Sequence, residues 1–279
     1  MKKGVLLIGV GHKNYLHMAE VLAASIRVND KGLDISIVTN HAIPDNQKFL
    51  FDKVIPLDVK QITIKGELHY IKSKLLMYDL SPYDETIFLD VDQVLIPKKK
   101  ISVLFDQLAD VDFTMSNTGI SDESIWAEIT EVQKLYGDVP FWNYHSELVY
   151  FKKTDAVKKY FNAAKKAYSD NKVKSAVKFS GGHMADELAF QIASMVTGLY
   201  PHAERWTPNF WYEREPLKNR KYPYELTEHI TYSIGGNTIP PAIKANYNNL
   251  AKSYFATLGL SNPYQVVDKR SFLPERKLI

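Results

Sequence analysis

The sequence predicts an α/β protein whose mostly parallel sheet is flanked by helices, and three observations support this fold class. Short apolar runs alternate with longer amphipathic stretches along the 279 residues, which is the pattern of βαβ units. The chain is 45% hydrophobic and 24% charged, as ordered globular proteins are. One apolar strand has two aspartates at its carboxyl end. Open α/β sheets bind their ligands outside the carboxyl ends of their strands.

The first half of the chain contains the expected units of strand, helix and strand. Short apolar runs predict strands at 4–10, 35–39, 54–57 and 86–92. Apolar side chains at helical spacing predict helices over 15–28 and through Ile71, Leu75 and Tyr78. Strands that alternate with helices in this way favour a parallel sheet covered on both faces.

The second half continues this pattern less regularly. Apolar runs predict strands at 112–116, 147–151 and 229–234. Periodicity predicts helices from about Asp155, over 184–195 and over 242–259, the last ended by Gly259. Two segments without periodicity are expected to be loops over a binding cleft: 117–143 and 200–227, with Trp126, Trp142, Trp206 and Trp211. We expect one domain over 1–259 with helical and loop additions at its C-terminal end, followed by a tail over 260–279.

Charge and cysteine content limit the classes of partner. The net charge is +3, and Lys and Arg are dispersed, so the composition permits a nucleic acid without indicating one. Without cysteine there is no disulfide and no thiolate nucleophile, which suits the cytoplasm, the location we expect. The opening MKKGVLLIGVG is interpreted as a strand because His12, Lys13 and Asn14 interrupt it. No apolar run approaches the roughly 18 residues of a membrane span, so none is expected.

The triplet Asp90-Val91-Asp92 is the strongest chemical signal in the sequence. Its two carboxylates share a face if the strand continues and converge if the strand breaks. Close carboxylates repel each other, so a cation between them is expected. A hard divalent ion, Mg²⁺ or Mn²⁺, bridging a phosphate satisfies both carboxylates. The alternative is a pair of solvated turn aspartates without a ligand.

Two enzyme classes place such a pair after an apolar strand. FLDVDQVL (88–95) resembles the haloacid-dehalogenase phosphatases, which implies that Asp90 is a nucleophile and Asp92 an acid/base. Ser116, after DFTM, is similar to the second motif of that class. Against this alternative, a complete βαβ unit precedes the strand, and no later pair of acids completes a magnesium site.

The second resemblance extends further along the chain. KLLMYDLSPYDETIFLDVD (74–92) is similar to family 8 of the GT-A glycosyltransferases, the glycogenin and bacterial galactosyltransferase branch. This resemblance implies a Rossmann-like GT-A fold in which the triplet 90–92 holds Mn²⁺ or Mg²⁺ against the diphosphate of a nucleotide sugar. Lys74 takes the place of the family's basic residue that contacts the donor.

Other motifs follow in the family's order, over about residues 4–245. GHKNY (11–15) resembles the loop whose Asn and Tyr hold the base and ribose, which implies these roles for Asn14 and Tyr15. YHSELVYF (144–151) resembles the strand that lines the donor sugar, with His145 in place of Asn, followed by Ser146. Glu147 stands where the family has Gly.

The resemblance also supplies candidates for catalysis and for a third metal ligand. GGHMADELAF (181–190) is similar to the segment with the family's Asp-Gln pair, which implies that Asp186 and Glu187 lie near the anomeric carbon. SIGGNTIPP (233–241) corresponds to the family's HxxGxxKPW, with Ser233 replacing His and Gly236 retained. Ile239 replaces the phosphate-binding Lys, a loss for which Lys244 or Lys252 are the candidate substitutes.

The function expected from this resemblance is metal-dependent transfer of a sugar from a nucleotide diphosphate sugar, a UDP-sugar, to an acceptor hydroxyl. The resemblance implies a hexosyl- or pentosyltransferase that retains anomeric configuration. The acceptors considered are a saccharide, including a lipid-linked one, a protein, a small metabolite and a modified DNA base. Besides the phosphatase, a non-catalytic sugar-nucleotide binding protein is an alternative, because the third-ligand motif has lost its His.

Overall fold

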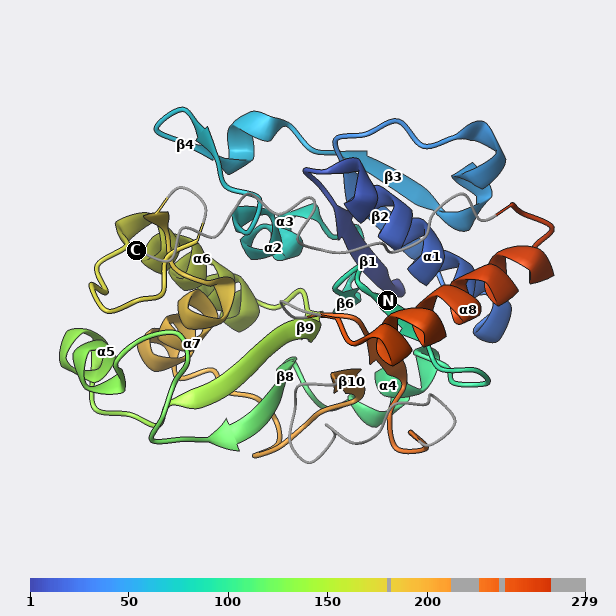
Figure 1. Ribbon diagram of the computed structural model, residues 1–279. Helices are drawn as coiled ribbons and strands as arrows, with labels where there is room; N and C mark the ends of the chain where they lie inside the picture. The colour runs from blue at the N-terminus through green and yellow to red at the C-terminus, as the bar shows by residue number, and fades with distance from the viewer. Residues whose placement is uncertain (180–181, 212–225, 236–238, 262–279) are drawn as a thin grey trace. The chain divides into compact units, whose positions relative to one another are not determined.

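The structure is a computed structural model, and it describes residues 1–179, 182–211, 226–235 and 239–261 (Figure 1). The chain is mixed α/β with a mostly parallel central sheet flanked by helices, which confirms the predicted fold class. It divides into two compact units: unit 1 is Met1–Lys2, Asp58–Phe88 and Asp110–Thr207, and unit 2 is Lys3–Leu57, Leu89–Ala109 and Pro208–Ile279. The boundary expected at 259 stays a prediction, since the tail from 262 lies outside the described residues.

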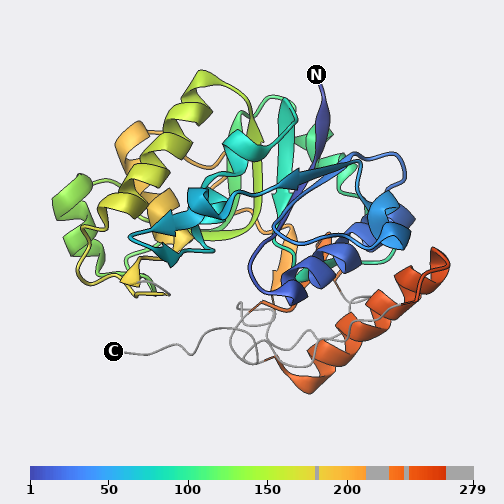
Figure 2. The ribbon, with the colours of Figure 1, turned by 90° about the horizontal axis from the view of Figure 1, so that it is seen from above.

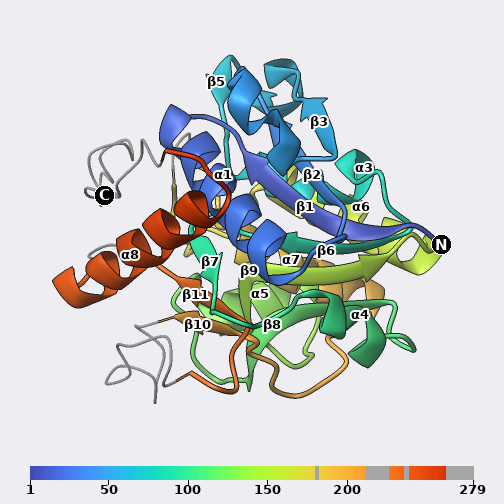
Figure 3. The ribbon, with the colours of Figure 1, turned by 90° about the vertical axis from the view of Figure 1, so that its right-hand side faces the viewer.

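Unit 2 is built on three parallel strands, and the one at the edge of the sheet is mostly exposed. Its strands β1 (Lys3–Gly9), β2 (Ile35–Thr39) and β3 (Lys53–Pro56) lie in the order β3-β2-β1. The helix α1 (Lys13–Asn29) connects β1 to β2 and packs against β1 (Figure 3). Because helices cover parallel strands, β2 is buried along its whole length and reads as a continuous apolar run.

The second part of unit 2 is a small mixed sheet with two helices. Strands β10 (Asn209–Trp211), β11 (Thr231–Ser233) and β7 (Gln93–Leu95) lie in that order. The helix α8 (Pro241–Thr257) packs along α1, as Figure 3 shows, and Tyr254 Oη donates to the Leu95 carbonyl at 2.8 Å. The short helices of this unit are α4 (Ser102–Gln107) and the 3₁₀ turn η1 (Asp45–Leu50).

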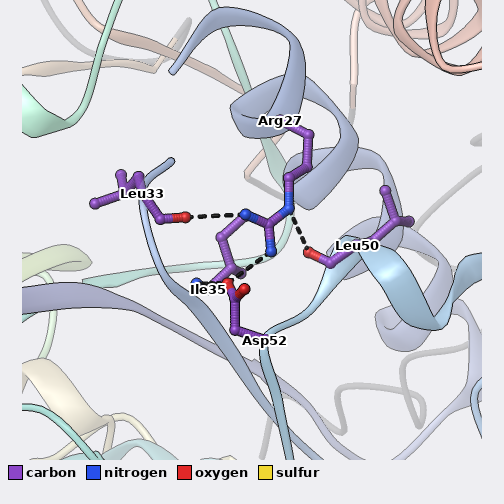
Figure 4. Close-up of polar contacts among 5 residues, drawn as sticks. All are labelled: Arg27, Leu33, Ile35, Leu50 and Asp52. Atoms are coloured by element: carbon purple, nitrogen blue, oxygen red, sulfur yellow. Dashed lines mark hydrogen bonds and ion pairs between the residues drawn. The ribbon is translucent and has the colours of Figure 1, made fainter. Parts of the chain in front are cut away.

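Arg27, near the end of α1, fixes that helix to the strands (Figure 4). Its guanidinium donates to the carbonyls of Leu33 (3.0 Å) and Leu50 (3.1 Å) and to Asp52 Oδ2 (2.6 Å). The same Asp52 oxygen accepts from the Ile35 N–H at 2.7 Å. A guanidinium presents several N–H groups in one plane, so one side chain satisfies three acceptors from two segments.

Unit 1 combines strands with two long helices. Strands β6 (Glu85–Leu89, ending at the unit boundary), β9 (Trp142–Lys152) and β8 (Phe113–Ile120) lie in that order, and β8 and β9 are antiparallel. Helices α6 (Asp155–Asp170) and α7 (Asp186–Thr197) pack side by side (Figures 1 and 2). The smaller elements are η2 (Val59–Ile62), β4 (Thr63–Ile64), β5 (Glu67–Leu68), α2 (Lys72–Leu75), α3 (Met77–Leu80) and α5 (Ile129–Tyr136).

Three expectations about local structure are wrong. The loop expected over 200–227 contains the strand β10. The helix expected through 71–78 is two short helices, α2 and α3, joined at Leu76 (φ −93°, ψ 0°). The expected loop over 117–143 contains the end of β8, the helix α5 and the start of β9. The β8–β9 register shifts between Met115 and Asn117 and again before Ile120. Because of these shifts, the sequence there lacks the regular alternation of apolar and polar residues that predicts a strand.

No helix within the described ranges is both long and apolar enough to cross a membrane.

Candidate active site

Four side chains from three separate motifs meet in unit 1. Lys74 Nζ donates to Ser146 Oγ at 3.1 Å and lies 3.4 Å from Asp186 Oδ2. Ser146 Oγ donates to Glu187 Oε1 at 3.0 Å. Lys74, Ser146, Asp186 and Glu187 thus form one polar cluster, which we call the Lys74 cluster. The sequence predicted each of them as a site residue, and the structure brings them together.

Local structure explains how these residues converge. Lys74 lies on α2, which packs against both α6 and α7. Ser146 is fully buried on β9, in the stretch where the register with β8 jumps from Met115–Val149 to Asn117–Tyr144. An irregular ladder of this kind re-aims side chains relative to a regular strand, as bulges beside active sites do. Asp186 and Glu187 begin α7, where the helix dipole favours acidic residues.

The chemistry of the donors fixes the direction of these hydrogen bonds. An ammonium group only donates, so Ser146 Oγ accepts from Lys74 and its single proton is left for Glu187. Burial, and then the charge of Asp186, raise the pKa of Glu187, while Lys74 opposes this shift. We infer that Glu187 holds a proton at neutral pH and that Lys74 mainly compensates the charge of Asp186, which is 7% exposed.

The raised pKa of Glu187 makes a prediction about stability. The native state keeps a proton that the unfolded chain releases near pH 4.3, so Glu187 lowers the free energy of unfolding increasingly as pH rises above about 4.5. Glu187→Gln removes this penalty. We expect the variant to match the wild type at pH 5 and to exceed it by at least about 1 kcal/mol at pH 8, measured by urea unfolding.

Glu131 provides a control of opposite sign in the same unit. Hydrogen bonds from Ser175 and from the Lys174 backbone lower the pKa of Glu131 to about 2. Glu131 therefore stabilises the fold above the pKa of the unfolded chain, and Glu131→Gln should lose stability as pH rises. If Glu187→Gln followed the same trend as Glu131→Gln, Glu187 would be ionised in the native protein at neutral pH.

The triplet 90–92 lies in unit 2, at a turn between two strands. Strand β6 ends at Leu89, Val91 and Asp92 form a turn, and β7 begins at Gln93, so the strand does not continue through the two acids. Asp90 is half-buried and Asp92 is 7% exposed. Of the two arrangements left open by the sequence, the structure has the broken strand.

The predicted third-ligand motif lies beside this turn. Strand β11 pairs antiparallel with β7, which places Ser233 opposite Gln93. The Ile234 N–H donates to the Asp92 carbonyl at 2.9 Å, and the buried Ser233 Oγ accepts from the Gly235 N–H at 2.9 Å. The expected proximity of the two motifs is therefore present. Gly236, also expected here, lies outside the described residues.

The groups at this turn suit a hard divalent ion only if a ligand completes the site. Asp90, Asp92 and Ser233 offer oxygen atoms, the donors that Mg²⁺ and Mn²⁺ prefer. No group of three or more His, Cys, Asp or Glu able to hold a metal occurs among the described residues. Phosphate oxygens and water would have to fill the remaining coordination positions, which is usual for Mg²⁺ bound with a phosphorylated substrate.

The expected nucleotide-binding residues lie at the start of a helix in unit 2. Asn14 and Tyr15, expected in a loop, belong to the first turn of α1 and are half-buried. The Asn14 N–H donates to His12 Nδ1 at 3.2 Å, which caps this turn. A Cβ on Gly9 would lie 3.2 Å from the Tyr15 carbonyl oxygen, so glycine permits the close approach of β1 to α1.

The remaining candidates occupy half-buried positions. His145 Nε2 lies 3.5 Å from Thr118 Oγ1 in unit 1. Trp211 Nε1 donates to the Gly235 carbonyl at 3.1 Å, which places this tryptophan beside the third-ligand motif of unit 2. The tryptophans expected over the cleft are all half-buried: Trp126, Trp142, Trp206 and Trp211.

Sequence reasoning missed one neighbour of the Lys74 cluster. Tyr168 of α6 is 1% exposed, and burial together with the charge of Asp186 raises the pKa of its phenol. The sequence marks this tyrosine only as part of an amphipathic helix, and nothing in its spacing indicates proximity to Asp186.

Comparison with known structures identifies the fold. The WbbM bifunctional glycosyltransferase superposes with a TM-score of 0.60 and 13% identity, over 91% of this chain and 51% of WbbM. The galactosyltransferase LgtC, solved with donor and acceptor sugar analogues, gives 0.53 and 13%, over 89% of this chain and 95% of LgtC. Mouse xyloside xylosyltransferase 1 gives 0.52 and 16%, over 86% and 99%. This chain thus spans about half the length of WbbM.

No protein-family model and no curated protein sequence matches the chain. At these identities the structural likeness defines the fold alone, and it is the GT-A fold of glycosyltransferases that the sequence led us to expect.

Proposed function

We propose that this chain is a metal-dependent glycosyltransferase that moves a sugar from a nucleotide diphosphate sugar, a UDP-sugar, to an acceptor hydroxyl. The observation that carries the proposal is the convergence of Lys74, Ser146, Asp186 and Glu187, which come from three motifs matched separately to one family. The GT-A fold supports the same class. The proposed acceptor is a saccharide, a protein or a modified DNA base.

The residues of unit 2 would bind the nucleotide and its diphosphate. Asp90 and Asp92 would hold Mn²⁺ or Mg²⁺, with Ser233 as a weaker oxygen donor at the place of the missing His. When bound, the ion supplies Lewis-acid stabilisation of the charge on the departing diphosphate. Tyr15 offers a ring face for the base, and Asn14 an amide for hydrogen bonds to the base or ribose.

The residues of unit 1 would act on the transferred sugar. Asp186 provides the negative charge that stabilises a cation-like sugar when the bond to the leaving group breaks. Lys74 and Ser146 hold this carboxylate and Glu187 in place, at contacts of 3.4 Å or less. A neutral Glu187 donates a hydrogen bond, as the amide of the family's Gln does. We propose transfer with retention of configuration.

A donor screen tests the proposal. The chain with Mn²⁺ and each of a panel of nucleotide sugars is examined by thermal shift, and positive donors are followed for slow hydrolysis. We expect one UDP-sugar to raise the Tm in the presence of Mn²⁺ and to be hydrolysed, since a ligand that binds only the folded state stabilises it. The anomeric NMR signal of the released sugar reports the stereochemistry. No shift with any donor would contradict the proposal.

A non-catalytic sugar-nucleotide binding protein is the second candidate, and Ser233 in place of a metal-binding His is the observation that favours it. This candidate predicts the thermal shift without hydrolysis. The phosphatase alternative predicts a phospho-aspartate intermediate at Asp90, so beryllium fluoride should bind this carboxylate as an analogue of that intermediate, whereas the transferase predicts no such adduct.

A further inference from the structure

Three aromatic side chains of unit 1 form a compact group that the proposed function does not use. The ring of His69 lies 4.5 Å, centroid to centroid, from the ring of His183 and perpendicular to it. The ring of Tyr168 stacks on His183 at 5.0 Å and meets His69 edge-on at 6.2 Å. His69 is 2% exposed and Tyr168 is 1% exposed. We call His69, Tyr168 and His183 the aromatic trio.

Hydrogen bonds indicate where protons lie in this trio. His183 Nδ1 lies 3.0 Å from the Tyr168 carbonyl oxygen, which only accepts, so Nδ1 carries a proton. His69 Nδ1 lies 3.3 Å from Tyr168 Oη. With a neutral His69 ring, the phenol donates to Nδ1, but a protonated ring would present a second donor to that hydroxyl.

The trio connects two of the three segments that form the Lys74 cluster. His69 follows β5 and precedes α2, five residues before Lys74. His183 precedes α7, three residues before Asp186, and Tyr168 lies on α6 within electrostatic reach of Asp186. Contacts that hold His69 against His183 therefore also hold the segment leading to Lys74 close to the segment leading to Asp186.

We propose that the aromatic trio is a positioning cluster, which keeps Lys74 in contact with Asp186 while His69 is neutral and releases this contact when His69 is protonated. The charged and titratable groups that face His69 are His183, Tyr168, Glu67 of β5 and Lys72 of α2. Of these four groups only Glu67 favours a protonated ring, and a backbone hydrogen bond involving Ile64 adds to its effect. A positive charge on the His69 ring would be repelled by Lys72 and disfavoured by His183, which would weaken the contacts of His69 with His183 and Tyr168.

Electrostatics agree with this geometry. Burial, followed by His183, lowers the pKa of His69, whereas Glu67 opposes the shift. The unfolded chain therefore takes up a proton at His69, near pH 6.5, before the native state does. Stability contributed by the trio is complete above that pH and is lost as pH falls toward the native pKa. The inference rests on the proposed function only for the catalytic role of the Lys74 cluster. The contact between Lys74 and Asp186 can be measured without any nucleotide sugar.

An NMR titration of the full chain, with ¹³C at the lysine ε carbons, tests the inference. Lys74 is assigned by the loss of its resonance in Lys74→Arg. Between pH 8 and pH 5, we expect the Lys74 resonance to shift with a component whose midpoint equals that of the His69 ring protons. In His69→Gln that component should vanish, while the resonance at pH 8 stays close to the wild-type position.

Tyr168→Phe keeps the ring but removes the hydroxyl that favours neutral His69. Loss of this hydroxyl should raise the titration midpoint of His69 by about half a pH unit, and the midpoint of the Lys74 resonance shift should move with it. His202→Gln is the control, because the ring of His202 contacts Thr114 Oγ1 (2.9 Å) and Trp206 rather than the trio. A Lys74 titration that is identical in wild type, His69→Gln and Tyr168→Phe would overturn the proposal, even if the donor screen succeeds.

Discussion

Replacing Asp90 and Asp92 together with asparagine is expected to reduce metal-dependent hydrolysis of the nucleotide sugar by about 1,000-fold or more. Asp90 and Asp92 are the only carboxylates proposed for the ion, and no group of three or more His, Cys, Asp or Glu able to hold a metal occurs among the described residues. A neutral amide binds a divalent cation far more weakly than a carboxylate, and the charge on the leaving diphosphate then goes uncompensated. Hydrolysis is measured at saturating Mn²⁺, with Mn²⁺ affinity measured by calorimetry.

The fold should survive this double substitution. The turn is held by backbone pairing of β7 with β11 and by the Ile234 N–H on the Asp92 carbonyl, none of which needs a carboxylate. Far-UV circular dichroism and Tm without metal should therefore stay close to wild type. Asp106→Asn, at an exposed position on α4 of the same unit, is the control and should keep full activity. Wild-type hydrolysis in the double variant would refute the metal role of the triplet.

Strands β1 and β2 of unit 2 were predictable because nearly all of their residues are buried, whereas β3 is mostly exposed. The predicted range 35–39 coincides with β2, in which every residue is buried, and the expected 54–57 differs from β3 by one residue at each end. A continuous apolar run bounded by polar residues leaves little choice of boundary. The sequence of unit 1 is less decisive, because the β8–β9 ladder is interrupted and Val132 is the only buried residue of α5.

The candidate site was predictable residue by residue, but not as an arrangement. Motif order identified Lys74, Ser146, Asp186 and Glu187, whereas their contacts depend on a strand irregularity at Ser146 that no local pattern encodes. The raised pKa of Glu187 likewise depends on burial and on Asp186, so it requires tertiary structure. Tyr168 reads from sequence as an ordinary core position, and its proximity to Asp186 follows only from the packing of α6 on α7.

Lys74→Ala is expected to produce the second large effect, a loss of about 100-fold to 1,000-fold in the rate of donor hydrolysis. The substitution removes the cation that lies 3.4 Å from Asp186 and donates to Ser146 at 3.1 Å. Ser146 then loses the donor that fixes its proton on Glu187, and the pKa of Glu187 rises further because Lys74 lowers it in the wild type. We expect kcat to fall much more than KM rises, because the residues proposed to hold the nucleotide and its diphosphate, which lie in unit 2, are unchanged.

Two further variants separate charge from geometry. Lys74→Arg keeps a cation but replaces a compact ammonium with a planar guanidinium, so it should recover the stability lost in Lys74→Ala and only part of the rate. Lys158→Ala, at an exposed position on α6 in the same unit, should change neither quantity. If Lys74→Ala and Lys158→Ala hydrolysed the donor equally fast, Lys74 would be a structural partner of Asp186 alone. If Lys74→Arg restored the full rate, positive charge rather than the hydrogen bond to Ser146 would be what the site requires.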